Sequence, residues 1–97
     1  MRLIWTPPAL SDREHIWLHI AHDNPAAAAR MDSLFDAAAE RLRDFPETGK
    51  LGATLGTREI VPHKSYRLIY TIDADTIWIV ALIHVARQWP PVRLDDA

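Results

Sequence analysis

Five side chains in the C-terminal half of the sequence could bind an anion or move a proton. A hydrophobic run ends in His84, and Arg87 follows three residues later. An arginine can hold a phosphate or a carboxylate through two hydrogen bonds, and a histidine can exchange a proton near neutral pH. We expect the end of this run to border a concave polar site that includes Arg67. The candidate binding residues are Arg58, Lys64, Arg67, His84 and Arg87.

Three of these candidates also have a purely structural explanation. Arg67 could pair with Glu59, and His84 could be a capped histidine of the core. Arg87 could be a solvated loop residue. The sequence contains no glycine-rich phosphate loop, no Ser-His-Asp pattern and no HExxH motif that would decide between these explanations. Both therefore stay open.

Three further histidines have the spacing of metal ligands on a helix face. They are His15, His19 and His22. No acidic residue completes a convincing ligand set with them, and the sequence has no cysteine. We therefore interpret them as polar surface and expect neither a metal nor another cofactor.

Composition indicates a small globular protein. The chain has 97 residues, of which 25% are charged and 48% hydrophobic. This length predicts one domain over residues 1–97, with a flexible tail at 90–97, and a domain of this size is only marginally stable without a partner. No apolar run is long enough to cross a membrane and the start is not a signal peptide, so we expect a cytoplasmic protein.

The distribution of charge narrows the choice of partner. The net charge is −2, which argues against sequence-blind binding of nucleic acid over a basic surface. Residues 58–93 nevertheless carry five basic and three acidic groups. This local excess is either a basic patch or ordinary scatter.

Hydrophobic spacing and turn residues predict the elements that must position the candidates. Two helices each begin at a polar cap followed by proline, and the later segments alternate or run apolar as strands do. The expected order is β-α-α-β-β-β in an α+β fold, a small antiparallel sheet with a helical hairpin packed on one face. The expected strands are Arg2–Trp5, Arg58–Val61, Tyr66–Ile72 and Ile77–His84; the helices end near His22 and Asp44, and a loop runs to about Gly56.

The last hairpin is specific enough to predict a register. A two-residue loop at Ala74-Asp75 places Tyr70 opposite Ile79 and Arg67 opposite Leu82. Because opposed residues share a face of the sheet, Arg67 and His84 should lie on the same side, away from the helices. A three-residue loop would change this register.

A series of residue types recurs in a distinctive order along almost the whole chain, about residues 1–90. In this order, and at this length, they resemble the ParE/RelE toxin superfamily of bacterial type II toxin–antitoxin systems. The residues are Leu10, Asp12, Ile16, Ile20, Asn24 to Ala27, Leu42, Pro46, Gly49, Thr57 to Ile60, Tyr66 to Tyr70 and Val80 to Arg87. The resemblance implies the fold described above and a cognate antitoxin from the same operon that neutralises the toxin.

The superfamily divides by target. RelE-like members cut messenger RNA on the ribosome, and in that case Arg67, His84 and Arg87 would be the catalytic residues. The catalytic tyrosine of those members has no counterpart between Trp89 and Arg93. ParE-like members poison DNA gyrase without a catalytic site, and the segment from His84 to Arg87 is closer to theirs. We prefer the ParE-like function, with the ribonuclease as alternative and a non-toxic corepressor module as the third hypothesis.

Overall fold

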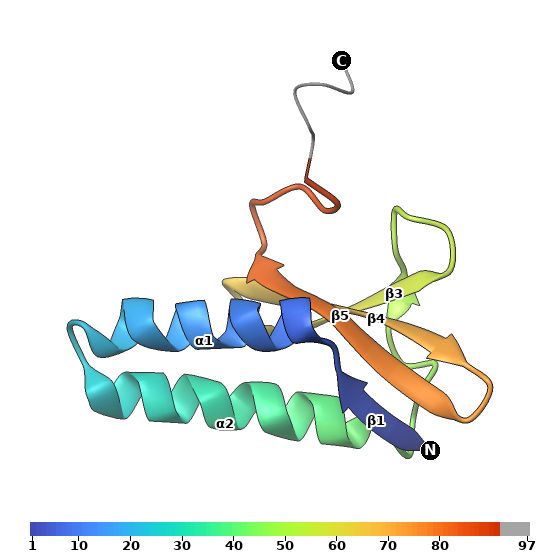
Figure 1. The fold of residues 1–97 in the computed structure, drawn as a ribbon, viewed down its shortest axis with the longest axis horizontal. Coiled ribbons are helices and arrows are strands. Elements are labelled where there is room, and N and C mark those ends of the chain that lie inside the picture. The colour runs from blue at the N-terminus through green and yellow to red at the C-terminus, as the bar shows by residue number, and fades with distance from the viewer. Residues whose placement is uncertain (92–97) are drawn as a thin grey trace.

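The computed structural model describes residues 1–91, which form two helices and a five-stranded sheet (Figure 1). The elements are β1 (Arg2–Trp5), α1 (Pro7–Ala21), α2 (Pro25–Arg41), β2 (Lys50–Leu51), β3 (Thr57–His63), β4 (Tyr66–Asp73) and β5 (Thr76–His84). The sheet order is β1-β5-β4-β3-β2. The α+β class and the predicted helical hairpin are confirmed. Of the tail predicted at 90–97, residues 92–97 lie outside the described residues.

Both helices begin at the predicted caps. Thr6 Oγ1 accepts a hydrogen bond of 3.4 Å from the N–H of Ala9, and Asn24 Oδ1 accepts one of 3.0 Å from the N–H of Ala27. A proline follows each cap, where its missing N–H costs nothing. The second helix ends short of the predicted Asp44 because bonds to the third preceding carbonyl tighten its final turn.

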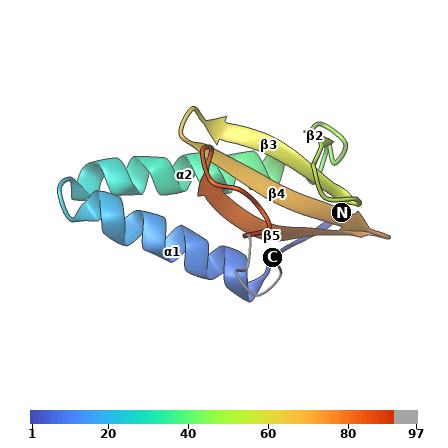
Figure 2. The same cartoon turned by 90° about the horizontal axis from the view of Figure 1, so that it is seen from above.

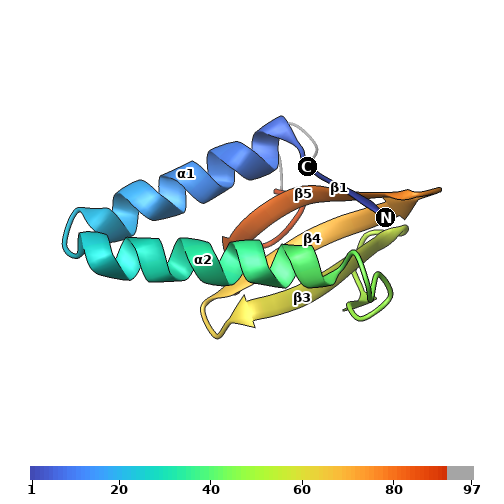
Figure 3. The same ribbon diagram turned by 90° about the horizontal axis from the view of Figure 1, so that it is seen from below.

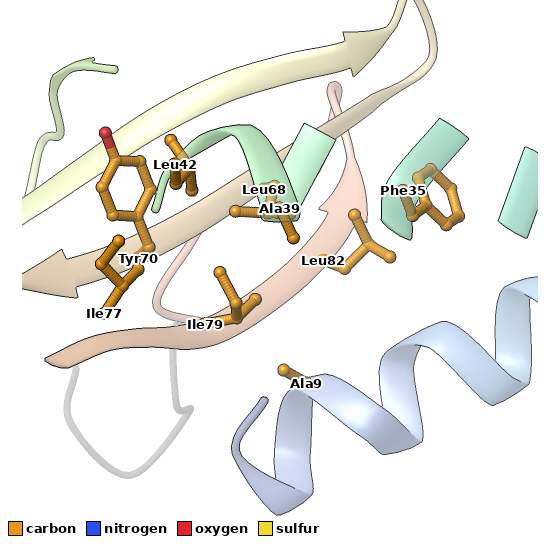
Figure 4. Packing of buried hydrophobic residues seen from close by; sticks show 9 residues of the cluster. All are labelled: Ala9, Phe35, Ala39, Leu42, Leu68, Tyr70, Ile77, Ile79 and Leu82. Atoms are coloured by element: carbon orange, nitrogen blue, oxygen red, sulfur yellow. The ribbon is translucent and has the colours of Figure 1, made fainter. Parts of the chain in front are cut away.

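The hairpin covers one face of the sheet and its loop end projects beyond it (Figures 1 and 2). Between the helices and the sheet lies a single apolar cluster, seen from close by in Figure 4. Its buried members are Ala9, Phe35, Ala39, Leu42, Leu68, Tyr70, Ile77, Ile79 and Leu82. The face of β4 and β5 that meets the helices is thereby fixed by burial of apolar surface.

A buried tyrosine ties the segment after α2 to the sheet. The Tyr70 hydroxyl donates a hydrogen bond of 2.7 Å to the carbonyl of Pro46 and accepts one of 2.9 Å from the N–H of Gly49. Burial raises the pKa of the Tyr70 hydroxyl above its ordinary value of 10.0. A Cβ on Gly49 would lie 2.6 Å from that hydroxyl oxygen, so only glycine fits there.

The sheet differs from the prediction in three details. β1 pairs in parallel with β5, so the sheet is mixed at that edge. β2 lies within the predicted loop, since a two-residue strand leaves no pattern to detect. β3 continues past Pro62 to His63 instead of stopping at Val61, because a bulge in the outer part of the strand accommodates the proline.

Candidate functional site

Arg67 lies on the sheet face away from the helices and is held by two acceptors. Its Nη1 donates a hydrogen bond of 2.8 Å to Glu59 Oε1, and its Nη2 donates one of 2.6 Å to the carbonyl of Arg87. The two paired side chains are 17% and 9% exposed, so water screens the charge pair weakly. The structural pairing with Glu59, which the sequence left open, is therefore confirmed.

The predicted register of the last hairpin is right near its turn and wrong at its far end. Tyr70 pairs with Ile79, as expected. The pairing then shifts by one residue, so that Arg67 lies opposite Ile83 rather than Leu82. One extra residue in a strand moves every later side chain to the other face of the sheet.

Val80 is that extra residue, since Ile79 and Ala81 both have partners on β4 and Val80 has none. The expectation that Arg67 and His84 share a face is consequently wrong. Leu82 packs into the core under the helices, and His84 follows on the same side of β5. Val80 stands in an unbroken apolar run, where no glycine or polar residue marks a bulge.

His84 ends a row of three rings across the sheet. Tyr66 pairs with both His63 and His84, and the ring centroids lie 6.2 Å and 5.9 Å from that of Tyr66. In each histidine Nδ1 accepts a backbone hydrogen bond of 3.1 Å, from Ser65 and Ala86 respectively. A neutral ring that accepts at Nδ1 carries its proton on Nε2, so both histidines present a donor at Nε2.

A groove of about 570 Å³ lies between α1 and the end of β5, and Tyr66 and His84 of the ring row line it. It is lined by Asp12, His15, Ile16, His19, Tyr66, Leu82, Ile83, His84, Ala86 and Arg87. Asp12 Oδ2 accepts a hydrogen bond of 3.0 Å from the N–H of Leu82 and so anchors α1 against the strand. We call this cavity the histidine groove.

The histidine groove contains residues predicted from the sequence to be polar surface. His15 and His19 lie one turn apart on α1 and line it together with Tyr66. Their spacing was the available signal, but the packing of α1 on β5 was needed to show which face it met. Within residues 1–91, no group of three or more His, Cys, Asp or Glu side chains is placed to hold a metal ion.

Only two of the five predicted site residues share the groove. They are His84 and Arg87, and Arg87 is exposed. Arg58 instead donates hydrogen bonds of 2.8 Å and 3.3 Å to the carbonyls of Gly49 and Glu47, which orders the segment after α2. Lys64 is exposed in the turn between β3 and β4. Arg67 does not line the groove, and its side chain donates a hydrogen bond to the backbone carbonyl of Arg87. The predicted roles of all five in binding stay predictions.

The described residues contain no helix that is both long and apolar enough to cross a membrane.

Comparison with known proteins identifies the fold. A solved chain from the chromosomal ParDE toxin–antitoxin system of Pseudomonas aeruginosa superimposes with a TM-score of 0.78 at 19% identity. The match covers 88% of this chain and 96% of that chain. At this identity the likeness establishes the architecture alone.

Sequence comparison identifies the family. Residues 3–89 match the family model described as the ParE toxin of the type II toxin-antitoxin system parDE. "Putative toxin Y4kP" of Sinorhizobium fredii is 35% identical over 94% of this chain and 95% of its own length. "Toxin RelE2" of Caulobacter vibrioides is 36% identical over 89% of this chain and 97% of its own. The resemblance stated from the sequence is confirmed: this chain belongs to the ParE toxin family, as the toxin of a type II toxin–antitoxin system whose partner is an antitoxin.

Proposed function

We propose that this toxin arrests growth by binding and poisoning DNA gyrase, an action that requires no catalytic site of its own. The observation that carries the proposal is the separation of the candidate catalytic residues. Arg67 lies on one face of the sheet, paired with Glu59, and His84 lies on the other. The chain would act in the cytoplasm as a single domain.

The separation of Arg67 from His84 matters because a ribonuclease needs its catalytic side chains close together. An acid or base must reach the reacting proton within about 3 Å, or through one water molecule. An arginine that stabilises the negative charge on the reacting phosphate must have free N–H groups that point at that phosphate. Two donors of Arg67 are already occupied, by Glu59 Oε1 and by the carbonyl of Arg87. This arrangement favours a structural role for Arg67 and a binding role for the groove that holds His84.

The ribosome-dependent ribonuclease remains the second candidate, and one feature favours it. The histidine groove gathers His15, His19, Tyr66 and His84 beside Arg87. A tyrosine beside histidines supplies groups that could move protons, although it lies on β4 rather than near the C-terminus. The non-toxic corepressor module is the third hypothesis, and it fails if the chain alone arrests growth.

The test compares gyrase and translation with the same purified protein. We expect the chain to inhibit supercoiling by gyrase and to accumulate gyrase-cleaved DNA, while a reconstituted translation reaction continues with intact messages. Fragmented messages on translating ribosomes, with gyrase unaffected, would refute the proposal and establish the ribonuclease.

A pair of charge reversals tests whether the histidine groove makes the contact. Arg87→Glu changes an exposed residue of the groove, and Arg30→Glu changes an exposed residue of α2 that does not line it. Reversing a charge inside an interface should weaken inhibition of gyrase by at least about tenfold. Arg30→Glu should leave inhibition unchanged. Equal effects of the two variants would remove the groove from the interface.

A further inference from the structure

The turn after β5, residues 85–87, carries Arg87 into the histidine groove and is held by three hydrogen bonds from its backbone. The N–H of Val85 donates a bond of 2.9 Å to the carbonyl of Ser65. The N–H of Ala86 donates one of 3.1 Å to His84 Nδ1, and the N–H of Arg87 donates one of 2.9 Å to the His84 carbonyl. Every N–H of the turn therefore has a partner, and His84 supplies two of the three acceptors.

The ring of His84 is itself held in place by the core. It meets the ring of Tyr66 edge to face, with an angle of 79° between the two planes. Tyr66 meets Phe35 in the same way, and Phe35 is only 1% exposed. Edge-to-face contacts are a preferred arrangement of aromatic rings, so they favour one orientation of the His84 ring. Figure 3 shows the end of β5 and the turn between β3 and β4 at the same end of the sheet, where the three rings meet. A chain of contacts thus runs from the core to the acceptor at Nδ1.

Arg87 depends on this turn for its position. Its side chain is exposed and forms no ion pair with a carboxylate in residues 1–91. The direction of such a side chain is set by the backbone dihedrals of its own residue, which also decide the allowed rotamers. The three hydrogen bonds fix the peptide that precedes Arg87. All three remain in a variant without the Arg67 side chain, because Arg67 bonds the carbonyl on the far side of the Arg87 Cα.

We propose that His84 is a positioning residue, which acts on the target through Arg87 and not through its own Nε2. Its Nδ1 atom holds the turn that directs Arg87. The proposal rests on the proposed function, in which Arg87 contacts gyrase from the histidine groove. A side chain with no acceptor at the place of Nδ1 leaves the N–H of Ala86 without its partner, and the turn then samples other conformations.

Two amide substitutions separate the roles of the two ring nitrogens. Asparagine has its carbonyl oxygen near the place of Nδ1 and accepts the N–H two residues ahead, as in an Asx-turn. Glutamine reaches the place of Nε2 and can donate there, but it has a carbon atom at the place of Nδ1. His84→Asn should therefore preserve the turn, and His84→Gln should release it. Because His84 is exposed, both variants should fold with a thermal midpoint close to that of the wild type.

Affinity for purified gyrase, measured by titration calorimetry, is the first test. We expect His84→Gln to bind about tenfold more weakly, since gyrase must then order the turn on binding, and His84→Asn to bind as the wild type does. His22→Gln is the matched control, because His22 is exposed at the end of α1 and does not line the groove; its affinity should be unchanged. Retained binding by His84→Gln with weakened binding by His84→Asn would show that Nε2 makes the contact and would overturn the proposal. An equal effect of the two variants would overturn it as well.

Backbone order parameters from NMR test the turn in the free toxin, without gyrase. The amides of Ala86 and Arg87 should have values near about 0.85 in the wild type and in His84→Asn, and below about 0.6 in His84→Gln. A turn that stays rigid in His84→Gln would overturn the proposal. If the order parameters follow the expected pattern and the wild type does not bind gyrase, the proposed target alone is refuted and the role of Nδ1 in the turn stands.

Discussion

Removing the carboxylate of Glu59 should destabilise the folded toxin and show whether Arg67 has a structural role. The pair is 2.8 Å long, and its side chains are 9% and 17% exposed. Loss of one partner leaves the other charge nearly buried without a counterion, which costs about 3–5 kcal/mol. The carbonyl of Arg87 would still accept a hydrogen bond from Arg67, but it carries no charge, and Arg67 Nε already lacks a hydrogen-bond partner among the described residues. A loss of 3 kcal/mol in a domain of this size lowers the midpoint of thermal unfolding by roughly 12–24 °C.

The assay is thermal unfolding of Glu59→Ala, Arg67→Ala and the double variant Glu59→Leu/Arg67→Met. Each single variant should lose about 3–5 kcal/mol of unfolding free energy. The apolar pair should recover most of the loss, because replacing a buried ion pair by apolar residues of similar volume is often neutral. If Arg67 is structural, the double variant still arrests growth. A double variant that folds stably but has lost toxicity would refute this reasoning and return Arg67 to the active site.

The remaining predictions concern the segment after α2 and a helix cap. Gly49→Ala should cost about 1–3 kcal/mol, because the added Cβ would lie 2.6 Å from the Tyr70 hydroxyl oxygen and 2.9 Å from the carbonyl oxygen of Glu59; urea unfolding measures it, and an unchanged midpoint would contradict the packing. Tyr70 ionises less readily in the folded state than in the unfolded state, so its contribution to stability is present below the ordinary pKa of 10.0 and is lost as the pH rises through the higher folded value. Unfolding free energy measured from pH 8 to 11 should therefore fall more steeply in the wild type than in Tyr70→Phe, and parallel curves would argue against the burial effect. Asn24→Ala should cost about 1 kcal/mol by removing the acceptor for the N–H of Ala27, whereas Asn24→Asp should not.

Local signals in the sequence were sufficient to predict the two helices and the four longer strands, but not β2 or the exact ends of α2 and β3. Thr6 and Asn24, each followed by proline, begin the two helices where predicted, because a cap and its proline act within one turn of chain. The turn between β4 and β5 was also correct, since Asp73 pairs with Thr76 around a two-residue loop. Family resemblance followed from residue order alone and needed no coordinates.

The candidate site depended on contacts that no local pattern encodes. The bulge at Val80 placed Arg67 and His84 on opposite faces, and an apolar run carries no mark of a one-residue shift. His15 and His19 joined His84 in one groove only because Asp12 anchors α1 on the end of β5.

Residues near in the chain thus determined the caps, the turn and the order of helices and strands, through interactions that span three or four residues. Tertiary structure decided which charges meet. Arg67 could have served as a free anion-binding group or as half of an ion pair, and the pairing of β3 with β4 brought Glu59 to within 2.8 Å of it. The register of a sheet is a long-range property, set by packing against the helices and by bulges, so the chemistry of a side chain on it cannot be assigned before the fold is known.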